Sequence, residues 1–183
     1  MKISEGIIFA IIMLMTMASN AGAQGHSAGM TWSFSGIGIS YERMIDDDAF
    51  IRTGVQLEMA ETFLGKRGET GVSFSVTRNS ILAQTTSRNG NAILFHAGPG
   101  IMGGYCRDYQ LRREPAAAGI AFGLEGRVGM TIVYERKVNI SLCVAPVIGM
   151  HMTRDDEYNP VIRYYRYGLL KAIMPEIGIK YRF

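Results

Sequence analysis

The chain has 183 residues, 48% of them hydrophobic and 19% charged, and its formal net charge is +3. The length suits a single domain. Lysine and arginine are scattered along the sequence, so neither charge nor composition indicates a nucleic-acid-binding surface.

The N-terminus carries an export signal. Lys2 precedes an apolar run from Gly6 to Ala18, and Ala21-Gly22-Ala23 fits the small-x-small pattern of a cleavage site. The run is shorter than the roughly 20 residues of a membrane-spanning helix. The sequence therefore predicts a cleavable helical signal peptide over residues 1–23 and one mature domain over residues 24–183. A retained N-terminal membrane anchor is the alternative.

Segments in which apolar residues alternate with small or polar ones follow one another through the rest of the chain. Successive side chains of a strand point to opposite faces of a sheet, so each segment predicts a strand with one apolar face. We expect strands over Ser27–Phe34, Gly36–Glu42, Ala49–Glu61, Val72–Gln84, Ala92–Cys106, Gly119–Tyr134, Asn139–Met152 and Ile173–Phe183.

The pattern varies in strength. It is clearest over Asn139–Met152, where only Val147 places an apolar side chain on the polar face. Over Val72–Gln84 the alternation fails at Arg78-Asn79, which predicts a β-bulge there. The first strand is the least distinct, because only Ser35 separates Phe34 from Gly36.

The connections between these segments alternate in length. Three are short (Asp46–Asp48, Arg88–Asn91 and Glu135–Lys137) and three are longer and polar (Leu64–Thr70, Arg107–Ala118 and Arg154–Arg166). Bacterial outer-membrane barrels have short periplasmic turns and long outer loops. We therefore predict an all-β fold, a single eight-stranded antiparallel transmembrane β-barrel. Aromatic residues near strand ends fit the two membrane interfaces; they are Trp32, Tyr41, Phe63, Tyr105, Tyr134, Tyr164, Tyr165, Tyr167, Tyr181 and Phe183.

The signal peptide and the segment Glu176–Phe183, EIGIKYRF, resemble those of the small outer-membrane β-barrel proteins of Gram-negative bacteria. The stretch FHAGPGIMGGY, Phe95–Tyr105, is similar to barrels of the Bacteroides group and, more distantly, to conjugal-transfer TraO barrels. The resemblance implies Sec-type export to the bacterial outer membrane and contact with its lipid and lipopolysaccharide. It also implies that the barrel-assembly machinery reads the alternate residues Ile177, Ile179, Tyr181 and Phe183.

Charged residues also fall on the inward faces of the predicted strands. An eight-stranded barrel has room only for side chains or one small ligand, and lone buried charges are costly. We therefore expect a structural network of ion pairs in the lumen, made by Arg52, Glu58, Glu125, Arg127, Glu176, Lys180 and Arg182. A narrow pore or small-ligand carrier is the alternative. Cys106 and Cys143 fall on non-adjacent strands, so we expect two unpaired fillers of the interior.

Catalysis would require a histidine beside a serine or a carboxylate. Of the three histidines, His151 is the best candidate, since it faces inward close in sequence to the acidic Asp155–Glu157. Motifs of lipid-modifying barrel hydrolases and acyltransferases are not visible. We expect a non-catalytic protein without cofactor or metal, in a structural, surface-exposed or envelope-binding role. A protein partner would then bind the loops Arg107–Ala118 and Arg154–Arg166.

Overall fold

A computed structural model describes residues 25–59, 70–87, 91–108, 118–154 and 159–183. The predicted signal peptide lies outside these residues. The elements are β1 (His26–Ser33), β2 (Gly36–Asp46), β3 (Ala49–Glu58), β4 (Gly71–Thr86), β5 (Ala92–Arg107), β6 (Ala118–Tyr134), β7 (Val138–Val144), β8 (Val147–Arg154), β9 (Pro160–Tyr164), α3 (Arg166–Leu170) and β10 (Glu176–Arg182).

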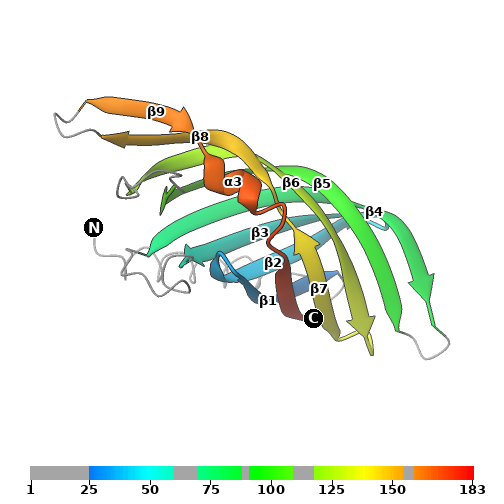
Figure 1. The fold of residues 1–183 in the computed structure, drawn as a ribbon. Helices are drawn as coiled ribbons and strands as arrows, with labels where there is room; N and C mark the ends of the chain where they lie inside the picture. Colours follow the sequence, from blue (N-terminus) through cyan, green and yellow to red (C-terminus); the bar gives the residue numbers. More distant parts are fainter. Residues whose placement is uncertain (1–24, 60–69, 88–90, 109–117, 155–158) are drawn as a thin grey trace.

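The strands form a closed antiparallel barrel (Figure 1). Each strand from β1 to β6 pairs with the next along the chain. The long β6 then pairs with β8 through its first half and with β7 through its second half. β10 pairs with β7 on one side and with β1 on the other, which closes the ring. The ten segments fill eight positions in the wall, because β7 with β8 and β9 with β10 each occupy one. The predicted eight-stranded all-β fold is confirmed.

The predicted strand Asn139–Met152 is interrupted between β7 and β8. The break falls at Ala145-Pro146, and proline has no N–H to donate to a neighbouring strand. The carbonyl oxygen of Pro146 still accepts a hydrogen bond from the Gly126 N–H at 2.9 Å, so the wall remains continuous. Val147, the one apolar residue on the polar face, is 1% exposed and belongs to an apolar cluster inside the barrel.

The eighth position differs more from expectation. The last strand begins at Glu176 and not at Ile173. The predicted loop Arg154–Arg166 is wrong for its second half, because Pro160–Tyr164 pairs with β8 as β9. A strand of five residues is too short for its alternation to stand out in the sequence. Between β9 and β10 the wall is made by residues 165–175, here called the inserted segment, which contains α3.

The barrel is strongly staggered. Gly178 of β10 pairs directly with Ser141, whereas the register followed round through β1 to β6 returns ten residues further along, at His151. Such a stagger accompanies strand tilt in a closed barrel. As a result the β8–β9 hairpin projects away from the rest of the wall (Figure 1).

Two details of the early strands are settled by the pairing. β1 is a strand, and Ser33 pairs with Gly36 across the tight turn Phe34–Ser35. A register shift in β4 does occur, but it lies between Ile81 and Ala83 and not at Arg78-Asn79. At Asn79 the backbone stays regular, and the side chain is an inward amide that donates to Thr77 at 2.9 Å. The sequence pattern at Arg78-Asn79 therefore reflects a buried polar side chain and not a bulge.

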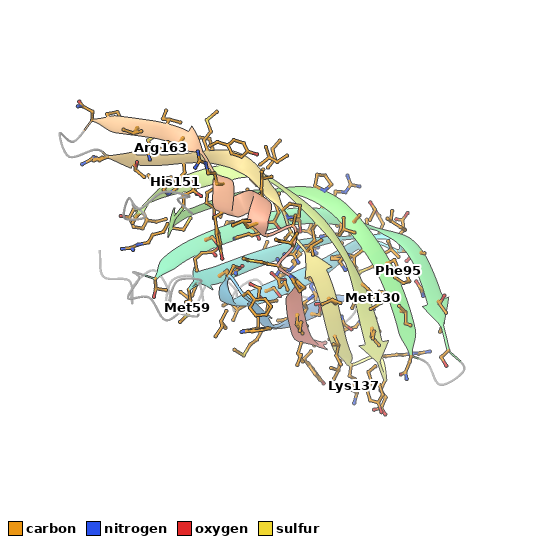
Figure 2. All side chains as sticks on the ribbon, in the orientation of Figure 1. Met59, Phe95, Met130, Lys137, His151 and Arg163 are labelled. Carbon is orange, nitrogen blue, oxygen red and sulfur yellow. The ribbon has the colours of Figure 1, made fainter. Side chains whose placement is uncertain are left out.

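The two ends of the barrel differ. Strands that flank the connections 47–48, 88–90 and 135–137 finish at one end of the barrel, here called the turn end. Strands that flank residues 60–69, 109–117 and 155–158 finish at the opposite end, here called the loop end. Figure 2 shows Met59, His151 and Arg163 toward the loop end and Lys137 at the turn end. Among the described residues, no helix combines the length and the apolar character needed to cross a membrane.

The packing of β4 against β5 depends on Gly98. A Cβ atom there would lie 1.8 Å from the carbonyl oxygen of Arg78, whereas a Cβ atom on Gly126 would meet nothing within 4 Å. Gly98→Ala should therefore lower the free energy of unfolding by about 2 kcal/mol, as overpacking does. The matched variant Gly126→Ala should leave it unchanged. Urea unfolding followed by the fluorescence of Trp32, the sole tryptophan, measures both, and equal stabilities would contradict the proposed close approach.

Candidate functional site

The middle of the lumen is filled by charged side chains from three strands. Glu176, at the start of β10, accepts hydrogen bonds from Arg52 Nη2 of β3 at 2.8 Å and from Arg127 Nη1 of β6 at 3.0 Å. Arg127 Nη2 also lies 3.4 Å from Glu125 Oε1, at ion-pair distance but without hydrogen-bond geometry. One carboxylate therefore ties together two guanidinium groups from distant parts of the ring.

A second ion pair lies nearer the turn end, at the seam where the barrel closes. Lys180 Nζ of β10 donates to Glu42 Oε1 of β2 at 2.5 Å. The other oxygen of Glu42 accepts from the Ser27 hydroxyl of β1 at 3.1 Å. These three strands are neighbours in the order β2, β1, β10, so the pair bridges the closing strand pair.

A third ion pair comes from the inserted segment. Lys171, directly after α3, donates from Nζ to Glu58 Oε1 at 2.6 Å, and the Ser73 hydroxyl donates to the same oxygen at 2.6 Å. Both charged side chains are buried. Lys171 therefore anchors the inserted segment to β3, on the far side of the seam.

The inserted segment replaces a strand by one turn of helix. Its backbone is satisfied within the turn by bonds such as Lys171 N–H to the Tyr167 carbonyl oxygen at 3.3 Å. Asp108 holds the start of α3, accepting from the backbone N–H groups of Arg166 at 3.2 Å and Tyr167 at 2.8 Å. Leu169 is exposed on the other side. The segment thus behaves as wall, with one face toward the lumen.

An apolar cluster packs inside the lumen beside the inserted segment. Tyr165 is fully buried, and its hydroxyl accepts a weak hydrogen bond from Cys106 Sγ at 3.6 Å. The aromatic expectation is therefore wrong for Tyr165 and Tyr167, which fill the lumen and do not lie at an interface. The cluster consists of Met102, Cys106, Ala121, Val147, Tyr165 and Tyr167, with Leu170 and Met174 packed against it.

The ion-paired charges of the lumen cancel. Among the described residues, the ion pairs of the lumen join four cations to four anions, and each of these residues is at most 9% exposed: Arg52, Arg127, Lys171 and Lys180, with Glu42, Glu58, Glu125 and Glu176. Pairing of this kind matters inside a narrow barrel, where an unpaired charge would be costly.

Little space remains beside these charges. A polar cavity of about 30 Å³ lies among the described residues, lined among others by Arg52, Arg127, Gln56 and Ser33. That volume holds about two water molecules. Gln56 donates to Ser35 at 2.6 Å and to Ser33 at 3.2 Å, so its amide is already engaged. This part of the lumen is filled by side chains.

Six of the seven predicted lumen charges are buried and form ion pairs. Arg182 is the exception: it is exposed, because it is the last residue of β10 and lies at the rim of the turn end. Sequence reasoning missed two members of the network. Glu42 shares the inward parity of Gly38 and Ser40 and could have been included. Lys171 could not, since it lies outside any alternating segment.

The histidines occupy structural positions in the described chain. His151 Nε2 donates to the carbonyl oxygen of Cys106 at 2.9 Å, and the ring stacks on Tyr165. His96 lies 3.2 Å from the Thr131 hydroxyl. His26 begins β1, where it is buried and bonded to the Tyr41 hydroxyl at 2.6 Å. The acidic residues 155–157 lie outside the described residues.

The remaining site expectations concern cysteines and metals. Cys106 and Cys143 are both free and buried, as predicted, and Cys143 Sγ accepts a hydrogen bond from Arg127 at 2.7 Å. Within the described ranges, no group of three or more histidine, cysteine, aspartate or glutamate side chains is placed to hold a metal ion.

Comparisons with protein-family models, with curated proteins and with solved structures gave no match to this chain. The geometry of the barrel is therefore the basis for assigning a function.

The lumen network makes a direct prediction for stability. Glu176→Gln removes the carboxylate that Arg52 and Arg127 share and leaves two buried guanidinium groups without their counter-charge. We expect the free energy of unfolding to fall by about 3 kcal/mol. Glu135→Gln, in the exposed turn between β6 and β7, is the control and should change it by about 0.5 kcal/mol or less. Urea unfolding decides the point, and equal losses in the two variants would contradict a network that stabilises the barrel.

Proposed function

We propose that this chain is a non-catalytic β-barrel of the bacterial outer membrane, with a sealed lumen and a structural or envelope-binding role. The observation that carries the proposal is the inverted distribution of its side chains. Charged groups are buried inside, whereas large apolar side chains such as Leu124 (69% exposed), Ile101 (62%) and Ile179 (61%) cover the outside. A water-soluble barrel of this kind would expose that surface to water at a high cost.

The apolar surface has the height of a bilayer core. On β5 the exposed side chains run from Ile93 to Tyr105. That stretch of strand is about 40 Å long and, at the usual tilt of about 40°, rises about 30 Å along the barrel axis. The hydrocarbon core of a bilayer is about 30 Å thick.

Exposed aromatic residues lie near both ends of this surface, as in the girdles of membrane barrels. Trp32, Phe34, Tyr105 and Tyr164 lie toward the loop end, and Tyr134, Tyr181 and Phe183 lie toward the turn end. In the proposed orientation the turn end faces the periplasm. Ile177, Ile179, Tyr181 and Phe183 are exposed on the outer face of the last strand, where assembly machinery could read them.

Because we propose that the lumen is sealed, we infer that the protein acts through its surface. The β8–β9 hairpin extends at the loop end, and β9 pairs only with β8 among the described strands. We propose that this end meets an envelope or surface partner. Sec-type export, the Gram-negative envelope with its lipopolysaccharide, and kinship with Bacteroides-type and TraO barrels belong to the same proposal. The alternatives to this proposal are a narrow pore or small-ligand carrier and a lipid-modifying barrel enzyme.

Membrane insertion predicts a dependence on depth. Val128 is 57% exposed near the middle of the apolar stretch of β6, and Ile45 is exposed near the turn end of β2. In lipid vesicles, Val128→Arg should lower the free energy of unfolding by about 2–4 kcal/mol and Ile45→Arg by about 1 kcal/mol or less. A water-soluble protein would instead tolerate Val128→Arg and become more soluble. That result, measured by urea unfolding and by fractionation, would contradict the proposal.

The sealed lumen predicts an electrically silent protein. In planar bilayers the wild type should show no steady single-channel conductance, because we propose that ion-paired side chains fill the lumen. Insertion should be verified in the same samples by heat-modifiable migration on a gel. Stable channels from correctly inserted protein would favour the narrow-pore alternative and refute the sealed lumen.

A further inference from the structure

Two arginines interrupt the apolar outer face of the barrel. Arg43 of β2 and Arg78 of β4 are both exposed. Ile51 of β3 pairs with Arg43 on one side and with Arg78 on the other. Residues paired across neighbouring strands lie on the same face of a sheet. Since Ile51 is exposed on the outside, the three side chains form one row across β2, β3 and β4, here called the arginine row.

The arginine row reaches well into the apolar surface. β4 runs from Gly71 to Thr86, so Arg78 lies near its middle. Phe74 on one side of it along the strand and Leu82 on the other are 51% and 69% exposed. On the neighbouring β5, Ile101 is 62% exposed. Arg78 is therefore surrounded by side chains that we assign to the lipid-facing surface.

The arginine row contrasts with the lumen. Every arginine of the lumen network has a carboxylate partner, but neither Arg43 nor Arg78 forms an ion pair or side-chain hydrogen bond with the described residues. An arginine on the lipid face destabilises a membrane barrel, and does so most near the midplane. The exposed hydroxyl-bearing residue Ser80, two positions after Arg78, adds a third polar group on the same face.

We propose that Arg43, Arg78 and Ser80 bind the phosphate of a phospholipid in the leaflet at the turn end. This inference rests on the proposed membrane insertion. The two arginines are separated by one strand, a distance of about 10 Å between their backbones. Their long side chains can converge on one phosphate and bend toward the interface, as arginine does in membranes. Guanidinium groups pair with phosphate through two parallel hydrogen bonds.

The surroundings fit the rest of a phospholipid. Phe74 and Ile101, which lie on the loop-end side of Arg78, offer apolar surface to the acyl chains that extend from the phosphate. The Asp46–Asp48 turn lies beside β4 on the turn-end side of the arginine row, because the Ile81 N–H donates to the Asp48 carbonyl oxygen at 2.6 Å. Its exposed carboxylates are the competing partners for the arginines, and the experiment must separate these two possibilities.

The test compares lipid retention by two double variants. Full-length protein is reconstituted in vesicles of equal parts phosphatidylglycerol and phosphatidylcholine, extracted into mild detergent, and examined by native mass spectrometry. The wild type should retain one phosphatidylglycerol, with a preference over phosphatidylcholine of about tenfold. Arg43→Gln/Arg78→Gln should abolish that preference. The control Arg154→Gln/Arg182→Gln removes two exposed arginines of the rim and should keep it.

Several outcomes would overturn the inference. Equal retention by the wild type and by Arg43→Gln/Arg78→Gln would show that the arginines do not hold the lipid. Loss of retention in the rim control would show that net charge alone is responsible. Release of the lipid by millimolar inorganic phosphate would assign the site to the free ion. A detergent-stable dimer abolished by Arg43→Gln/Arg78→Gln would mean that a second chain occupies the row.

Failure of the inference and failure of the proposed function look different. If the protein inserts and shows heat-modifiable migration but retains no lipid, only the phosphate site is refuted. If the protein does not insert into these vesicles, the proposed membrane location itself is refuted. An Asp47→Asn/Asp48→Asn variant that leaves lipid retention unchanged supports the phosphate site. Increased retention in that variant also supports it, because the carboxylates then compete for the same arginines.

Discussion

The pairing of β10 with β1 is the constraint on which the rest of the structure depends. It turns a sheet into a ring, so every strand in the closed part has two neighbours and every side chain must point either in or out. The inward side chains of eight strands share a narrow space, where a charge without a partner is costly. The Glu42–Lys180 pair links β10 to β2 across β1, and Glu42 also accepts a hydrogen bond from Ser27 of β1. Closure and internal charge pairing therefore stabilise each other.

The inserted segment shows how such a ring tolerates an irregular stretch. A break in a strand leaves backbone groups without a neighbour, which a wall exposed to lipid cannot allow. The turn of α3 pairs these groups within itself, and Asp108 accepts the N–H groups that remain at its start. Its residues Tyr165 and Lys171 are buried and occupy space in the lumen.

The sequence predicted what depends on alternation and failed where other chemistry intervenes. Strand order, closure and the inward position of residues such as Arg127 follow from the two-residue period, which holds for most of the chain. The predicted strand Asn139–Met152 is interrupted at Pro146, which has no N–H to donate. The bulge predicted at Asn79 was wrong, because Asn79 is a polar residue that faces inward at a regular position of the strand. Lys171 was out of reach, because its partner Glu58 is 113 residues away and no local pattern places them together.

The ion pairs of the lumen contrast with the two arginines on the outer face of the barrel. In the lumen of the described chain, ion pairs join four cations to four anions. On the outer face, Arg43 and Arg78 lie in one row with no carboxylate of the described chain bonded to them. If the outer face meets hydrocarbon, as we propose, two arginines without a counter-charge are costly there unless the membrane supplies their anion. A phospholipid phosphate satisfies that requirement with the chemistry guanidinium prefers.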